Sequence, residues 1–78
     1  MTINDLIPGN IYSSLNNNGL YIFRSNGFNK YKSRITADNH YAEDGTFGSP
    51  ISEKLRLPTE EEILRLESYE KLLTYEIY

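Results

Sequence analysis

The stretch Leu57-Pro58-Thr59-Glu60-Glu61-Glu62-Ile63-Leu64 decides the fold of this 78-residue chain, because it begins a helix. Thr59 is a favourable N-cap residue, and Glu62 stands three positions later. This spacing forms a capping box, in which each side chain accepts a hydrogen bond from the backbone N–H of the other residue. Pro58 disfavours a helical conformation in the residue before it, so the preceding chain should be extended. We therefore predict a helix over residues 59–73.

The predicted helix has one broad apolar face. At about 100° per residue, this face is formed by Ile63, Leu66, Tyr69, Leu72 and Leu73. Such a face usually packs on a core, so we expect the helix to cover one face of a sheet or the mouth of a barrel. Leu64 lies outside this face and is either an exposed leucine or part of a partner contact.

Before the helix, residues 8–57 form a β-rich body. Apolar and alternating runs separated by turn residues predict the strands: these are 10–15, 20–24, 30–36, 41–42 and 51–57. Asn18-Gly19 and Asn26-Gly27 are dipeptides typical of hairpin turns, and 43–50 is predicted as a polar loop. Both faces of 20–24 are apolar, which predicts a central strand covered on both sides.

These elements predict a single α+β domain over residues 1–78. We expect an antiparallel meander of about three to five strands, open or curled into a small SH3-like barrel, packed by the one C-terminal helix. The length leaves room for one domain. The tail, 74–78, has β propensity and could add an edge strand or dock into a partner.

The composition excludes several kinds of site. There is no cysteine, so disulfides, thiolate metal sites and cysteine nucleophiles are ruled out. His40 is the only histidine, and the acidic residues near it lack the number and spacing of a zinc or calcium site. No catalytic motif surrounds any serine. We therefore expect a non-enzymatic protein without metal or cofactor; an enzyme with His40 as its base remains a third hypothesis.

The main candidate binding surface combines basic and aromatic residues. In 30–36, three basic residues alternate with Tyr31, Ser33 and Ile35, which predicts one basic outer face and one buried face. The predicted ligand-binding residues are Tyr21, Arg24, Lys30, Lys32 and Arg34. Cations interleaved with aromatic rings can hold phosphates and stack on bases. The alternative is a solvated face whose lysines prevent pairing between sheet edges.

Charge is distributed unevenly along the chain. Residues 1–40 carry four basic and two acidic residues, or 4 − 2 = +2, whereas residues 41–78 carry four basic and nine acidic residues, or 4 − 9 = −5. The acidic helix could therefore meet a basic protein, or be only a solvated face. Because a chain of this size buries a small core, we also expect a homo-oligomer. Its predicted partner interface is Leu64, Tyr75 and Tyr78.

Residues 54–66, Lys54-Leu55-Arg56-Leu57-Pro58-Thr59-Glu60-Glu61-Glu62-Ile63-Leu64-Arg65-Leu66, resemble a segment of many small bacteriophage proteins, especially those of phages of Bacteroidota. In those proteins a β-rich body is followed by an Arg, a small residue or Pro, a Thr, Glu-Glu and a leucine-bearing helix. In those proteins a Lys-rich or aromatic end usually follows the helix; here the end is Tyr75-Glu76-Ile77-Tyr78. The resemblance implies a phage origin and a host-cytoplasm setting, and it carries over no catalytic residue.

Small acidic phage proteins commonly bind and block host machinery, including antiviral defence. The first hypothesis is therefore a non-enzymatic protein that binds a host protein or a small nucleotide stoichiometrically. The alternative is a nucleic-acid-binding accessory domain that uses the basic and aromatic strand pair, although a net charge of −3 argues against general nucleic-acid binding. The sequence shows no signal-peptide pattern and no apolar run long enough to span a membrane, so we expect the host cytoplasm as the location.

Overall fold

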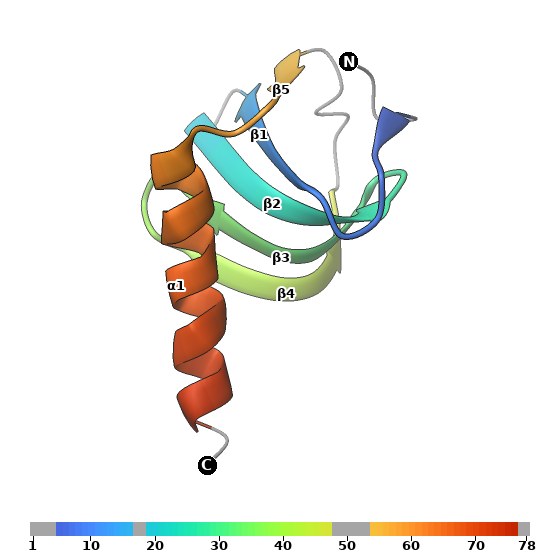
Figure 1. The fold of residues 1–78 in the computed structure, drawn as a ribbon. Coiled ribbons are helices and arrows are strands. Elements are labelled where there is room, and N and C mark those ends of the chain that lie inside the picture. Colours follow the sequence, from blue (N-terminus) through green and yellow to red (C-terminus); the bar gives the residue numbers. More distant parts are fainter. Residues whose placement is uncertain (1–4, 17–18, 48–53, 77–78) are drawn as a thin grey trace.

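The computed structural model describes residues 5–16, 19–47 and 54–76 and shows a curled antiparallel sheet with one long helix against it (Figure 1). The elements are β1 (Ile11–Asn16), β2 (Gly19–Gly27), β3 (Lys30–Thr36), β4 (Tyr41–Thr46), β5 (Leu55–Arg56) and α1 (Glu60–Glu76). The strand order is β4-β3-β2-β1-β5, so the predicted meander is confirmed and β5 is added beside β1. In the described part of the chain, α1 does not qualify as a membrane-spanning helix.

The sheet stays open, so the alternative of a closed SH3-like barrel was wrong. Among the described strands, β4 and β5 are the two edges of the sheet and do not pair with each other. β5 pairs with β1 only through Ser13 with Arg56 and Ser14 with Leu55. A strand this short has few backbone N–H and C=O groups for the row of hydrogen bonds that would close the sheet into a barrel. Residues 51–53, predicted to belong to this strand, lie outside the described residues.

β2 is central, as predicted, and its two faces belong to different cores. Ile22 packs with Ile35 and Leu66 beneath α1. Phe23 packs on the opposite face, inside the curl of the sheet, in a second core. The buried members of this aromatic core are Leu6, Tyr12, Phe23, Tyr31, Phe47 and Leu55.

A β-bulge divides the residues that were expected to share one face of β3. The register of β3 against β2 shifts around Lys32, which is left without a counterpart in β2. One extra residue in a strand reverses the alternation of side chains beyond it. Tyr31 therefore joins Phe23 in the aromatic core, whereas Ile35 packs with Leu66 beneath α1. The prediction that Tyr31 and Ile35 point to the same face was wrong.

β4 is longer than the predicted strand 41–42 and takes in much of the predicted loop 43–50. Its Gly45 lies opposite Tyr31, and the Tyr31 ring fills the space that a side chain on Gly45 would need. Phe47 follows the strand, is 8% exposed and lies 4.9 Å from the Tyr31 ring, centroid to centroid. A single aromatic residue among polar neighbours gives no strand pattern, which is why this segment was missed.

The hairpin between β2 and β3 turns within the predicted gap 25–29, but two residues beyond the predicted hairpin dipeptide. Gly27 pairs with Lys30, so Phe28 and Asn29 form the turn instead of Asn26-Gly27. Phe28 adopts a left-handed φ of 50°. The other predicted turn includes residue 18, which lies outside the described residues.

α1 begins with the predicted capping box. The Thr59 N–H donates to Glu62 Oε1 at 2.8 Å, and the Glu62 N–H donates to Thr59 Oγ1 at 3.3 Å. The helix continues to Glu76, beyond the predicted end at residue 73, so 74–76 are helical and do not form an extended tail. Leu72, which was assigned to the buried face, is 60% exposed.

Candidate functional site: a charged groove beside the helix

On the face of α1 that lies against the sheet, successive turns contribute Glu62, Leu66 and Glu70. Leu66 is fully buried, and Glu62 is 9% exposed. Two carboxylates therefore flank the one leucine at the centre of the contact. A buried carboxylate requires hydrogen-bond donors, and the strands supply them.

Glu62 is bound at three points beneath the start of the helix. Its Oε1 and Oε2 each accept a hydrogen bond of 2.9 Å from the Arg56 guanidinium, and Oε2 accepts one of 3.0 Å from Ser13 Oγ. Burial favours a higher pKa for Glu62, but the bonds from Arg56, the Thr59 N–H and Ser13 outweigh it and lower the pKa below 4.5. Glu62 is therefore a charged structural anchor at neutral pH.

Glu70 repeats this arrangement two turns further along. It accepts hydrogen bonds of 3.2 Å from both Nε and Nη2 of Arg24 and one of 2.9 Å from Ser33 Oγ. Arg24 also donates through Nη1 to the Gly9 carbonyl at 2.8 Å. One serine and one arginine from the sheet thus hold each of the two inward carboxylates of α1.

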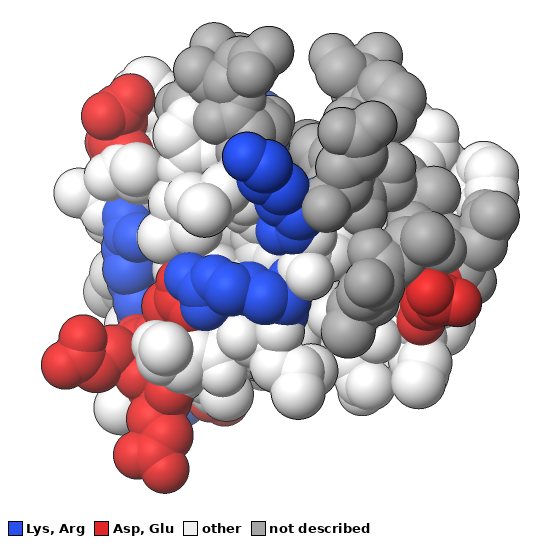
Figure 2. Space-filling model, turned by 90° about the horizontal axis from the view of Figure 1, so that it is seen from above, with Lys and Arg blue, Asp and Glu red and all other residues white. Residues whose placement is uncertain are grey.

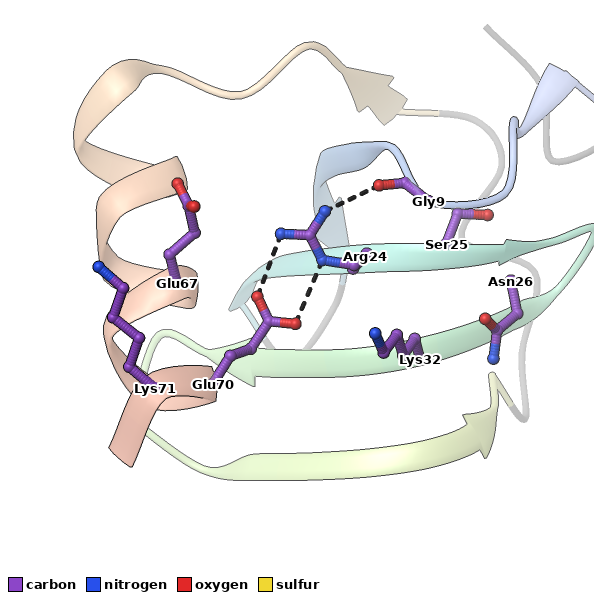
Figure 3. A pocket seen from close by; sticks show the side chains of 8 residues that line it. All are labelled: Gly9, Arg24, Ser25, Asn26, Lys32, Glu67, Glu70 and Lys71. Atoms are coloured by element: carbon purple, nitrogen blue, oxygen red, sulfur yellow. Dashed lines mark hydrogen bonds and ion pairs between the residues drawn. The ribbon is translucent and has the colours of Figure 1, made fainter. Parts of the chain in front are cut away.

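An open groove lies next to the Arg24–Glu70 pair (Figure 3), with a volume of about 440 Å³. β2, β3, α1 and the segment before β1 all contribute to its walls. Its principal polar side chains are those of Arg24, Asn26, Lys32, Glu67, Glu70 and Lys71. Lys32 and Lys71 come from β3 and α1, and no hydrogen bond or ion pair joins either ammonium to another residue in the described ranges.

Three of the four arginines differ from these lysines, because each donates hydrogen bonds to other residues of the protein. Arg24 and Arg56 pair with glutamates of α1, and Arg65 donates to the Thr36 carbonyl and to Asn39 Oδ1, both at 2.7 Å. Figure 2 shows basic side chains in the middle and at one side of the face that carries β5 and the start of α1, with acidic side chains beside and around them. Of the groove cations, Lys32 and Lys71 are therefore the two available to a ligand.

A second hollow of about 170 Å³ shares Lys32 and Glu70 with the groove and extends to Tyr41. The Tyr41 ring stacks on that of Tyr69, with centroids 5.8 Å apart and planes at 9°. Its hydroxyl donates to Glu43 Oε1 at 3.2 Å. Burial, together with the nearby Glu43 carboxylate, raises the pKa of Tyr41 to about 12. Tyr41 is therefore a protonated hydrogen-bond donor at neutral pH and not a base.

The five predicted ligand-binding residues do not form one surface. Arg24 and Lys32 meet in the groove. Arg34 lies on the opposite face of the sheet, with its Cζ 5.4 Å from the centroid of the Tyr21 ring, and Tyr21 is only 8% exposed. Lys30 is exposed and lines neither of the two hollows. The predicted basic and aromatic face is thus divided by the sheet.

The sequence did not point to the groove residues Asn26, Glu67, Glu70 and Lys71, nor to Ser33, which donates to Glu70. The sequence feature that could have indicated them is the presence of serines at strand positions that are otherwise apolar. Ser13 and Ser33 are at most 1% exposed, and a buried hydroxyl requires a partner. A carboxylate on the covering helix is a suitable acceptor.

The remaining predicted residues lie away from the groove. Leu64, from the predicted partner interface, is 65% exposed on α1. The side chain of Tyr75 and the whole of Tyr78 lie outside the described residues. His40 lies exposed in the turn between β3 and β4, where its carbonyl accepts a hydrogen bond from the Thr36 N–H.

Comparison of the chain with protein-family models, with curated proteins and with solved structures gave no match. Any function therefore has to be inferred from the groove itself.

Proposed function

We propose that this protein acts by stoichiometric binding and that the groove takes a small phosphorylated ligand of nucleotide size. The observation that carries the proposal is the pair Lys32 and Lys71. They come from different elements, line one hollow and have no partner among the described residues. Ammonium groups form charge-assisted hydrogen bonds with phosphate oxygens. Figure 3 shows the Lys71 ammonium turned away from Lys32, so a phosphate would bind both lysines once the flexible Lys71 side chain turns into the hollow.

The size and chemistry of the groove support a ligand that is larger than phosphate alone. A volume of about 440 Å³ falls within the range of small-molecule sites. Asn26 offers an amide donor and acceptor, and Glu67 offers a carboxylate acceptor at the wall formed by α1. These groups suit the amino and ring nitrogen atoms of a nucleobase, so a mononucleotide matches the groove at both ends.

The arrangement supports binding rather than catalysis. A general base must be deprotonated and within reach of its target, and Tyr41, beside the groove, holds its proton at neutral pH. Glu70 is held by Arg24 and Ser33. His40 is not among the residues lining the groove.

The biological setting we propose follows from the resemblance of residues 54–66 to phage proteins. In an infected host cell, a protein of this kind would act by sequestering a nucleotide, and interference with antiviral defence is one such role. The nucleic-acid alternative requires Tyr21 and Arg34 to act together with Arg24 and Lys32. Because the first two lie on the other face of the sheet, we favour the small ligand.

Isothermal titration calorimetry with ATP, AMP, adenosine and inorganic phosphate tests the proposal. We expect AMP or ATP to bind at one site per chain and adenosine to bind much more weakly. Loss of one charge-assisted contact, in Lys32→Ala or Lys71→Ala, should weaken binding by about tenfold. Lys30→Ala is the matched control, because Lys30 is exposed on the same strand as Lys32 but outside the groove.

Two results would contradict the proposal. One is the absence of measurable heat with every phosphorylated compound. The other is an equal loss of affinity in Lys30→Ala, which would indicate a diffuse charge effect without a site. Ion-exchange chromatography of the nucleotide after incubation should recover it unchanged, and any turnover would show that the protein is an enzyme.

A further inference from the structure

Phe28 combines two unfavourable features at the tip of the β2–β3 hairpin. Three non-glycine residues of the described chain have positive φ: Phe28 at 50°, Asn39 at 64° and Asp44 at 49°. Asn and Asp tolerate this left-handed region because their short polar side chains hydrogen-bond locally, whereas a bulky aromatic residue does not. The Phe28 side chain is also 62% exposed. Neither packing within the chain nor turn chemistry accounts for a phenylalanine here.

Exposed apolar and basic residues lie near the Phe28 turn, because the segment before β1 passes close to Gly27, where an added Cβ would meet Pro8 Cγ at 3.2 Å. The segment before β1 runs beside the end of β2, where the Gly9 N–H donates to the Ser25 carbonyl at 2.8 Å. Ile7 in this segment is 57% exposed. Lys30 follows directly after the turn and is exposed. We define the hairpin knob as Phe28, Ile7 and Lys30.

The side of α1 that faces away from the sheet carries the opposite charge. Glu61, Leu64, Ser68 and Leu72 follow one line along the helix, and all four are exposed. Leu64 and Leu72 are 65% and 60% exposed. We define these four residues as the outer stripe. It begins with an acidic residue and carries two exposed leucines, with Ser68 between them.

We propose that the hairpin knob of one copy of this chain docks on the outer stripe of a second copy. Each surface exposes large apolar side chains, and each carries one charge of opposite sign: Lys30 in the hairpin knob and Glu61 in the outer stripe. Complementary charge steers association and fixes its orientation. The knob lies at the end of the sheet remote from α1 (Figure 1). The contact is therefore head-to-tail and does not close within a pair of molecules.

Sedimentation velocity over a concentration series tests this proposal with two variants. Phe28→Asn removes the knob and suits the left-handed turn, so its Tm should be equal to or higher than that of the wild type. Leu64→Gln combined with Leu72→Gln removes the stripe at exposed positions. The wild type should grow in mass with concentration beyond a dimer, whereas each variant alone should remain a monomer. Leu15→Gln is the matched control, because Leu15 is a large residue, 51% exposed, outside both surfaces.

Mixing the two variants gives the sharpest test. Each retains one intact surface, so a head-to-tail contact predicts a one-to-one complex that grows no further. Added salt should weaken this complex, because its charges lie at the rim of the contact. A wild type that stays monomeric at every concentration would overturn the proposal. So would folded variants that associate like the wild type, or a mixture that shows no complex.

Discussion

At the scale of single residues, Glu62 shows how one side chain serves two purposes. Its spacing from Thr59 starts the helix, and its carboxylate binds Arg56 and Ser13 beneath the helix. The first role was predictable because it depends on residues close in sequence. The second depends on the pairing of β1 with β5, which places Ser13 and Arg56 side by side. That pairing leaves no local signature in the sequence.

We expect Glu62 to make the stability of the fold depend on pH. Its pKa in the folded protein is lowered below 4.5, so the unfolded chain takes up the proton first as pH falls. The stabilisation is therefore present above the unfolded pKa and is lost as pH falls through the folded pKa. Urea unfolding at a series of pH values should show Glu62→Gln destabilised by about 1–3 kcal/mol near neutrality. This difference from the wild type should shrink as pH falls below 4.5.

Glu61→Gln is the control for that series, because Glu61 is exposed in the same first turn of α1. It should follow the wild-type curve at each pH. A difference between wild type and Glu62→Gln that stays constant down to acid pH would contradict the assigned role of the carboxylate.

Gly45 is a second residue with a specific steric role. A Cβ added there would overlap the Tyr31 ring, so Gly45→Ala should displace that ring and destabilise the fold by about 1–3 kcal/mol. Combining Gly45→Ala with Tyr31→Leu should cost less than the sum of the two single changes, because the clash is then absent. Strictly additive free energies in a double-mutant cycle would contradict the contact.

At the scale of elements, the sequence predicted the helix start, the central strand β2 and most of the meander. Each of these elements has a strong local sequence pattern. The helix begins with a capping box, β2 is apolar on both faces, and polar turn residues separate the strands. The bulge at Lys32 and the extent of β4 were not predictable in this way, because both are features of pairing between strands and have no local sequence pattern. The bulge also separated Arg34 from Lys32 and so divided the predicted binding face.

The packing of α1 predicts a sharp contrast between two of its leucines. Leu66 is fully buried between the two carboxylate anchors, whereas Leu64 is 65% exposed. Leu66→Ala should lower the free energy of unfolding by about 2–5 kcal/mol, and Leu64→Ala by less than about 0.5 kcal/mol. Urea denaturation followed by circular dichroism measures both. Similar losses for the two variants would mean that α1 packs through a different face.

At the scale of the whole molecule, an open sheet covered by one helix leaves a groove where the two layers diverge. The charge of this groove comes from β2, β3 and α1 together. Arg24 and Lys32 were predicted as ligand-binding residues from the sequence, whereas Glu70 and Lys71 were not. Only the placement of α1 against β2 and β3 brings them together.

A two-dimensional 1H–15N NMR titration with AMP would show directly whether the groove is the binding site. A ligand bound between Lys32 and Lys71 should shift the amide signals of Asn26, Lys32 and Lys71 at one-to-one saturation. The signals of Tyr21 and Arg34, on the opposite face of the sheet, should move little. Shifts confined to that opposite face, or no shifts at saturating AMP, would contradict the assignment of the groove as the binding site.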